Sequence, residues 1–225
     1  MKKVTVKNLI DFRRKTERTK KTFVNNLKKE KGAEDNSGGG DYWISCLSAI
    51  SNAFRNGNTS LLDEKIQQLA EKIKHSEIKR IKNQFQRNID ILNNFKDFNL
   101  QNLKPATNLV FHVQPKNKSI LDIKGFPVEA KPNHVFSFSE NGSNEIGAIW
   151  FISKLNGYKK SELGMFADIA YRYLKQNFSD EYYVNPAFCT AVDVYNGLEV
   201  NYEAIRSGNI PTLIENTILE IKKIQ

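Results

Sequence analysis

Three charged side chains within residues 119–131 have the chemistry of a metal-dependent hydrolytic site. They are Asp122, Glu129 and Lys131, in the sequence SILDIKGFPVEAK. Carboxylate oxygens are the hard ligands that Mg²⁺ prefers, and a metal ion beside a lysine can activate water and stabilise the charge that develops on a phosphate. We therefore predict Asp122 and Glu129 as metal ligands, and these two acids with Lys131 as a catalytic set.

The spacing of the two acids suits a tight hairpin. If Lys124 and Gly125 form a two-residue turn, Asp122 faces Pro127 across the hairpin. Glu129 then lies two positions after Pro127 in the second strand of the hairpin, on the same face as Asp122. Both carboxylates would project from one side of the hairpin, within reach of a shared ion. The other interpretation of these charges is an ordinary sheet whose charged face meets water.

The elements that must position these residues begin after Lys104-Pro105, where the apolar pattern changes to the alternation typical of strands. Five such runs occupy residues 109–113, 120–123, 126–130, 134–138 and 146–153. They are followed by a helix from Ser161, an apolar strand over 188–195, a short strand over 198–202 and a helix from Pro211. The order β-β-β-β-β-α-β-β-α predicts a mixed α/β domain over residues 105–225.

Residues 42–104 show helical periodicity instead. Apolar side chains recur at intervals of three and four residues from Trp43 to Phe98, which predicts three helices, and Asp41 can cap the first of them. Residues 32–41 (GAEDNSGGGD) are small and polar and predict a flexible Gly-rich linker. The fold class predicted for the chain is α+β, with a helical N-terminal region in front of the sheet domain.

Residues 1–31 hold the net charge of the whole chain. They contain twelve lysines and arginines against three acids, whereas the other 194 residues carry 22 charges of each sign. Leu9, Phe12, Phe23 and Leu27 fall on one helical face, and basic residues cover most of the rest. We predict a basic amphipathic helical arm, which can neutralise the phosphates of nucleic acid, or meet an acidic partner or an anionic membrane surface.

Ten cations are the predicted nucleic-acid contacts, because they stand on faces that lack apolar side chains. Those in the arm are Arg13, Arg14, Lys15, Arg18, Lys20 and Lys21, and those on the helix over residues 77–98 are Lys79, Arg80, Lys82 and Arg87. Contacts of this kind would bind phosphates without reading sequence.

The order of several strands, Lys154 near a strand end, a helix and then a buried strand resembles the PD-(D/E)XK nuclease superfamily. The resemblance covers roughly residues 108–196. It implies a restriction-endonuclease-like core, in which the second and third strands bring an acid and an acid-x-Lys motif together around Mg²⁺.

Two alignments with that superfamily motif are open. In the first, Pro132-Asn133 takes the place of the first acid and Ile152-Ser-Lys154 that of acid-x-Lys. Neither position then has a carboxylate, so the site would be inactive, with Lys154 left as a phosphate contact. In the second, Asp122 and Glu129-Ala-Lys131 supply every side chain, but the hairpin is shorter than the superfamily normally uses.

Several observations bear on location and on single residues. No apolar run approaches the ~20 residues that span a bilayer, and no signal-peptide core follows the first lysines. Cys46 and Cys189 stand in apolar contexts, as buried thiols of a reduced, cytoplasmic protein do. Asp193 lies inside an apolar strand, and we expect it at the strand's exposed end.

The sequence thus predicts a cytoplasmic, nucleic-acid-associated protein (DNA or RNA) with a nuclease-like domain. That domain would be either degenerate or a Mg²⁺-dependent phosphodiesterase acting through Asp122, Glu129, Lys131 and Lys154. The alternative is a non-enzymatic interaction subunit, whose basic arm docks on an acidic protein partner and whose α/β domain is a scaffold.

Overall fold

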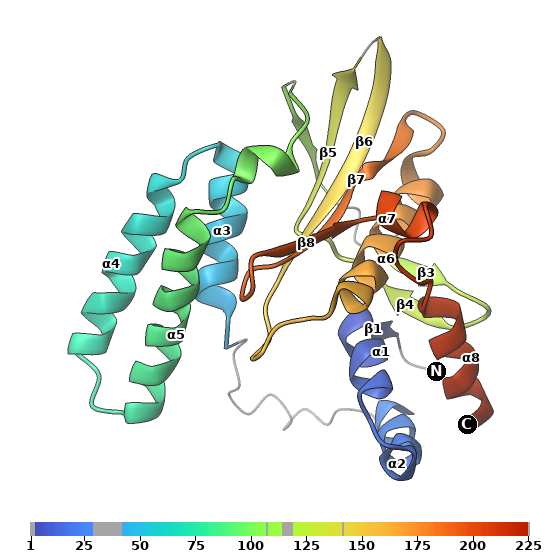
Figure 1. Cartoon of the computed structure of the whole chain (residues 1–225), viewed down its shortest axis with the longest axis horizontal. Coiled ribbons are helices and arrows are strands. Elements are labelled where there is room, and N and C mark those ends of the chain that lie inside the picture. The colour runs from blue at the N-terminus through green and yellow to red at the C-terminus, as the bar shows by residue number, and fades with distance from the viewer. Residues whose placement is uncertain (1–2, 29–41, 107, 114–118, 141, 225) are drawn as a thin grey trace.

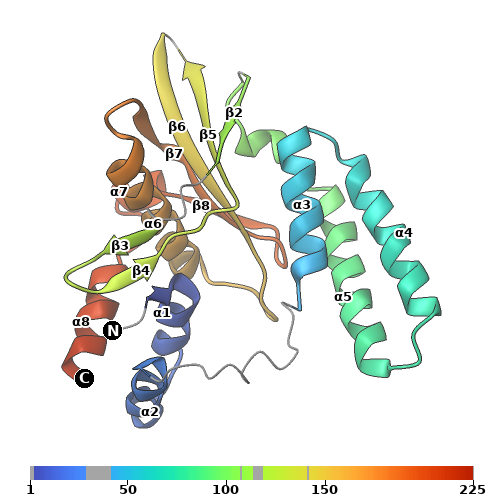
Figure 2. The same cartoon turned by 180° about the vertical axis from the view of Figure 1, so that it is seen from behind.

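Two layers of helices enclose a five-stranded sheet (Figures 1 and 2). The computed structural model describes residues 3–28, 42–106, 108–113, 119–140 and 142–224. Its helices are α1 (Val6–Arg13), α2 (Glu17–Lys28), α3 (Ile44–Asn56), α4 (Ser60–Lys74), α5 (Lys79–Lys96), α6 (Lys160–Phe178), α7 (Glu203–Arg206) and α8 (Ile214–Ile224), with a short 3-10 helix at Leu100–Leu103. Its strands are β1 (Val4–Thr5), β2 (Val110–His112), β3 (Ile120–Asp122), β4 (Pro127–Glu129), β5 (His134–Glu140), β6 (Ser143–Ile152), β7 (Tyr183–Asp193) and β8 (Leu198–Asn201).

The structure confirms the α+β class and the predicted order of strands and helices after residue 105. The five-stranded sheet has the order β2-β5-β6-β7-β8. Its pairs are antiparallel except β6 with β7, which run parallel because α6 carries the chain across the sheet between them. The long central strands β6 and β7 therefore connect an antiparallel meander to a crossover unit.

The predicted strands do not all share one sheet. β3 and β4 pair with each other and with β1, and they form a separate three-stranded sheet of order β1-β4-β3. β1 runs parallel to β4, so that Val4 lies opposite Val128 and Thr5 opposite Glu129. This pairing joins residues more than 120 positions apart, and a local alternation pattern carries no information about it.

Alternate side chains of the central sheet feed two apolar cores. On β6, Ile149 and Phe151 pack with α3, α4 and α5, whereas Ala148 and Ile152 pack with α1, α6 and α8. In Figure 1 the first group of helices lies to the left of the sheet and the second to the right. Because both faces are covered, the central strands are apolar on both sides.

The N-terminal segment belongs to one of these cores. Leu9, Ile10, Phe12 and Val24 are at most 1% exposed and pack in the core with α6 and α8. The segment forms two helices, α1 and α2, where the sequence predicted one. The break between them, at residues 14–16, falls inside the run 13–21, which has no apolar side chain. In the described residues, α1 and α2 therefore pack as a structural part of the sheet domain.

The predicted linker over 32–41, and Asp41 as a cap, lie outside the described residues. In the described ranges, no helix is both long and apolar enough to cross a membrane. The thiols of Cys46 and Cys189 are fully buried, in agreement with the sequence prediction.

The contact between His134 of β5 and helix α3 is expected to stabilise the fold to an extent that depends on pH. The ring nitrogen Nε2 of His134 lies 2.7 Å from Ser51 Oγ, and the ring stacks on Phe54. Burial lowers the pKa of His134, and the positive charges of Arg55 and Lys104 lower it further. A histidine whose folded pKa lies below its unfolded value of about 6.5 stabilises the fold above that pH, and this stabilisation is lost as the pH falls toward the folded pKa.

We therefore expect the His134→Gln variant to lose less stability on acidification than the wild type does. The free energy of unfolding, measured in urea at pH 7.5 and at pH 5.5, should show a smaller difference between the two proteins at the lower pH. His75→Gln is the matched control, because the side chain of His75 is 82% exposed. If the free energies of unfolding of wild type and His134→Gln differed by the same amount at both pH values, the pH dependence would not come from His134.

Candidate functional site

A pocket of about 300 Å³ lies between β4, β6 and the start of α1. Its polar side chains include Glu129, Lys131 and Asn133, which occupy alternate positions and so face the same side of the chain. Its apolar wall is formed by Val6, Leu47, Trp150, Phe151, Ile152 and Phe166. We call it the Glu129 pocket. It brings residues of both alignments with the nuclease motif into one place.

Glu129 is paired with two lysines. Its Oε1 atom lies 2.6 Å from Lys3 Nζ and 2.7 Å from Lys131 Nζ, and its side chain is only 13% exposed. Burial raises the pKa of this carboxyl, but the hydrogen bonds from Lys131 and Lys3 together outweigh burial and lower the pKa. Glu129 is therefore ionised at neutral pH and already neutralised by side chains of its own chain.

The hairpin geometry predicted for Asp122 is confirmed. Asp122 lies opposite Pro127, and Lys124 and Gly125 form the turn with positive φ angles of 55° and 71°. The Oδ1 atom of Asp122 accepts a hydrogen bond from Gly125 N at 2.6 Å. The carboxylate thus stabilises its own turn, which is a common use of aspartate.

These contacts use one oxygen of each predicted magnesium ligand. Glu129 Oε1 meets Lys3 and Lys131, and Asp122 Oδ1 accepts the turn amide, so a Mg²⁺ ion bound by the pair would lie beside two lysines. The described residues also contain no group of three or more His, Cys, Asp and Glu side chains that could hold a metal. The predicted catalytic Lys131 serves here as an ion-pair partner of the predicted ligand.

The residues of the other alignment, Asn133 and Ile152, also lie together in the Glu129 pocket, but neither of them is an acid. Asn133 Oδ1 accepts a hydrogen bond from Phe151 N at 2.7 Å, which ties the start of β5 to the end of β6. Ile152 is 3% exposed and packs in the core. Lys154 Nζ lies 2.7 Å from Asp11 of α1. The predicted catalytic Lys154 therefore anchors a helix, and within the described residues it forms no hydrogen bond or ion pair with Asp122 or Glu129.

Two of the predicted phosphate contacts are engaged in the fold. The guanidinium of Arg14 donates to both carboxylate oxygens of Glu162, at 2.6 and 2.5 Å, and to Gly157 O at 3.3 Å. Lys20 is 8% exposed and forms ion pairs with Glu17 and Glu220. Arg14 joins α1 to α6, and Lys20 joins α2 to α8. Their positive charges are compensated within the molecule.

Other predicted contacts remain available to a ligand. Lys15, Arg18 and Lys21 are exposed, and none of them has an acidic partner among the described residues. On α5, Lys79 and Arg80 are also exposed, Lys82 is half-buried, and Arg87 donates to the Tyr42 hydroxyl at 3.4 Å. Arg13 donates to Thr217 Oγ1 at 3.2 Å. The two basic groups lie in different helical layers, on opposite faces of the central sheet (Figure 1).

Asp193 is fully buried, not at the exposed end where the sequence analysis expected it. Its carboxylate accepts hydrogen bonds from the backbone N–H groups of Tyr158 and Tyr195 and from the Asn196 side chain. These donors lower the pKa of Asp193, but burial outweighs them and raises it. The residue holds the loop before α6 against the loop after β7, and an acid inside an apolar run was the only sequence signal of this role.

The fold and these sites define an α+β protein with a mixed central sheet and a basic surface on its N-terminal helices. Comparison with protein-family models, with curated proteins and with solved structures found no match in any of the three.

Proposed function

We propose that this protein binds nucleic acid through the surface formed by Lys15, Arg18 and Lys21, which we call the α2 surface. The observation that carries the proposal is that these three cations are exposed and lack an acidic partner in the described chain. Unpaired lysines and arginines gain free energy on meeting phosphates, because they release the counterions of the polyanion.

The geometry of α2 supports this use. Arg18 and Lys21 are three residues apart, so they lie on one helical face with their Cβ atoms about 5–6 Å apart. Val24 and Lys20 are buried on another face of the same helix and hold it against α1 and α8. A rigid helix can therefore present a fixed row of positive charges to a phosphate backbone.

The topology of the central sheet supports a nuclease-like scaffold, whereas the side chains at the motif positions do not support metal-dependent cleavage. The meander β2-β5-β6, the crossover α6 and the parallel strand β7 follow the order that the PD-(D/E)XK resemblance implies. At the motif positions, however, stand Asn133 and Ile152, and Glu129 is neutralised by lysines. We therefore propose binding as the function, and not hydrolysis.

The test is retention of single- and double-stranded DNA and RNA by wild type and by the variant Lys15→Ala/Arg18→Ala/Lys21→Ala. Loss of three phosphate contacts should reduce the slope of log affinity against log salt concentration by about three. The charge-matched control is Lys79→Ala/Arg80→Ala/Lys82→Ala on α5. Equal loss in both variants would show that the α2 surface is not the specific binding site, and absence of binding by the wild type would refute the proposal.

The same samples test cleavage. Wild type is incubated with each nucleic acid and with Mg²⁺ or Mn²⁺, beside the variant Glu129→Gln. We expect intact substrate in both cases. Cleavage by the wild type that is lost in Glu129→Gln would overturn the scaffold proposal and support the metal-binding alignment of Asp122 and Glu129.

A further inference from the structure

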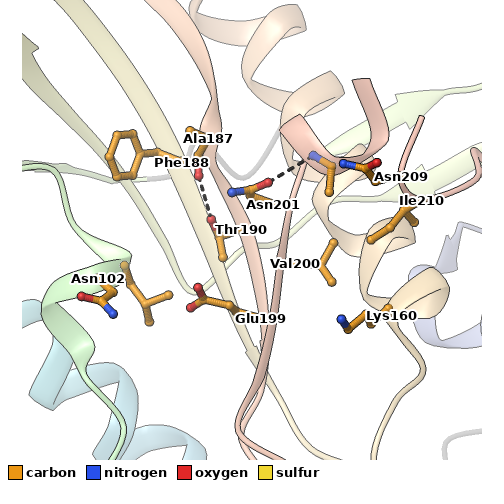
Figure 3. A pocket seen from close by; sticks show the side chains of 12 residues that line it. Asn102, Lys160, Ala187, Phe188, Thr190, Glu199, Val200, Asn201, Asn209 and Ile210 are labelled. Atoms are coloured by element: carbon orange, nitrogen blue, oxygen red, sulfur yellow. Dashed lines mark hydrogen bonds between the residues drawn. The ribbon is translucent and has the colours of Figure 1, made fainter. Parts of the chain in front are cut away.

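A second pocket, of about 280 Å³, lies at the β7–β8 edge of the central sheet (Figure 3). Strands β7 and β8, the 3-10 helix and the start of α6 form its walls. Its lining includes the apolar residues Leu103, Phe188, Val200 and Ile210, and the polar residues Asn102, Lys160, Thr190, Glu199, Asn201 and Asn209. We call it the Glu199 pocket.

The strand register places several of these side chains on one face of the sheet. Thr190 lies opposite Asn201, and Val192 lies opposite Glu199. Because side chains two positions apart share a face, Glu199 and Asn201 project to the same side as Thr190 and Phe188. Glu199 and Asn201 are about 7 Å apart along the strand, as two residues of an extended chain are.

The hydrogen bonds determine which groups remain for a ligand. Asn201 Oδ1 accepts a hydrogen bond from Ala204 N at 3.2 Å, so the amide nitrogen Nδ2 is the free end of this side chain. Figure 3 shows this nitrogen on the side of Asn201 opposite to the oxygen that accepts the hydrogen bond. Glu199 is exposed at the pocket, and its carboxylate has no hydrogen bond or ion pair with any described residue; desolvation raises its pKa. Glu199 and Asn201 therefore offer two acceptor oxygens and one amide donor group on the same face of β8.

We propose that the Glu199 pocket binds the guanine base of a guanine nucleotide. The Watson–Crick edge of guanine has two neighbouring donors, N1–H and N2–H₂, and beside them the acceptor O6. The two oxygens of Glu199 match the donors, and Asn201 Nδ2 matches O6. Adenine and cytosine offer one donor group beside a ring acceptor, and uracil offers one donor between two acceptors. Only guanine satisfies the carboxylate with both oxygens.

The remaining lining suits the other parts of such a ligand. Phe188 and Leu103 provide apolar surface for the flat base. Lys160 also lines the pocket, has no acidic partner in the described chain, and supplies a positive charge for a phosphate. A guanidinium group could also meet Glu199 with two N–H donors, but it has no acceptor for Asn201 Nδ2. The inference goes beyond the proposed function, because it concerns a different face of the molecule and a mononucleotide.

Calorimetric titration with guanosine 5′-monophosphate tests the proposal on the full chain. We expect this ligand to bind at least about tenfold more tightly than the adenosine, cytidine and uridine monophosphates, since a bidentate base contact discriminates by this amount or more. Equal affinity for all four nucleotides, or no binding of the guanosine nucleotide at millimolar concentration, would overturn it. Preferred binding of agmatine would overturn it as well, in favour of a guanidinium ligand.

Variants assign the binding to the pocket. Glu199→Gln keeps the size of the side chain but replaces one acceptor by a donor, and we expect it to weaken binding of the guanosine nucleotide ten- to a hundredfold or so. Glu203→Gln is the matched control, because Glu203 pairs with Arg206 and does not line the pocket. Equal binding by Glu199→Gln and wild type would overturn the proposal. The variant of the α2 surface should keep nucleotide binding, so the two proposals can fail separately.

Discussion

Replacement of Arg14 by alanine is expected to lower the free energy of unfolding by about 3 kcal/mol, although Arg14 belongs to the most basic segment of the chain. The reason is its bidentate ion pair with Glu162, whose side chain is only 8% exposed. Loss of one partner of a buried pair leaves the other charge uncompensated and costs about 3–5 kcal/mol. Arg14 itself is one third exposed, which places the cost at the lower end.

The effect should depend on pH. Burial raises the pKa of Glu162, but the hydrogen bonds from Arg14 and from Lys159 N together outweigh burial and lower the pKa. An acid with a lowered folded pKa stabilises the fold above its unfolded pKa of about 4.3, and this contribution is lost as the pH falls through the folded pKa. Wild type and Arg14→Ala should therefore differ more at pH 7 than at pH 3.

Arg18→Ala is the control for this prediction. Arg18 is exposed and unpaired within the described chain, and its loss should change the free energy of unfolding by no more than about 0.5 kcal/mol. Urea unfolding followed by circular dichroism at both pH values measures all three proteins. If Arg14→Ala and Arg18→Ala have equal stability, the ion pair does not hold α1 against α6 in solution. The comparison also separates the structural cations from those proposed to bind phosphate.

Replacement of Phe54 by alanine is expected to cost about 4 kcal/mol, the middle of the range for a buried phenylalanine. Phe54 is fully buried where α3 meets the central sheet. Its ring centroid lies 5.5–6.2 Å from those of Phe111, His134, Phe136 and Phe151, which come from three strands. Because this aromatic cluster is shared by the helical layer and the sheet, the cavity would weaken both.

Ile44→Ala is the matched control on the same helix, since Ile44 is 60% exposed and should change stability by no more than about 0.5 kcal/mol. The two tryptophans report on the two cores separately. Trp43 packs in the core with α3, α4 and α5, and Trp150 packs against the core that contains α1, α6 and α8. In single-tryptophan variants, both fluorescence signals should change at the same urea concentration, with Phe54→Ala shifting them together. Two separate transitions would show that the layers unfold independently.

Local patterns in the sequence determined most of the secondary structure. The five alternating runs after residue 105 became β2 to β6, and the apolar stripes of residues 42–104 became α3, α4 and α5. The turn at Lys124-Gly125 and the register of Asp122 with Pro127 were also predictable. Each of these features depends on neighbours within a few positions, since backbone geometry alone decides which side chains share a face.

The tertiary structure decided which charges are free. The sequence analysis counted Arg14 and Lys20 with Lys15, Arg18 and Lys21, because all five look alike in a basic run. Their partners lie far along the chain: Glu162 is 148 positions from Arg14, and Glu220 is 200 positions from Lys20. In the same way, Lys3 neutralises Glu129 from 126 positions away.

The physical reason is that residue type determines only the sign of a charge. Its free energy depends on burial and on partners within about 4 Å, which the chain brings together only on folding. The sequence by itself thus supplied the acids and bases of a candidate metal site. The folded chain engaged those acids internally, exposed the three cations of the α2 surface, and left the unpaired carboxylate of Glu199 in a pocket that no motif had indicated.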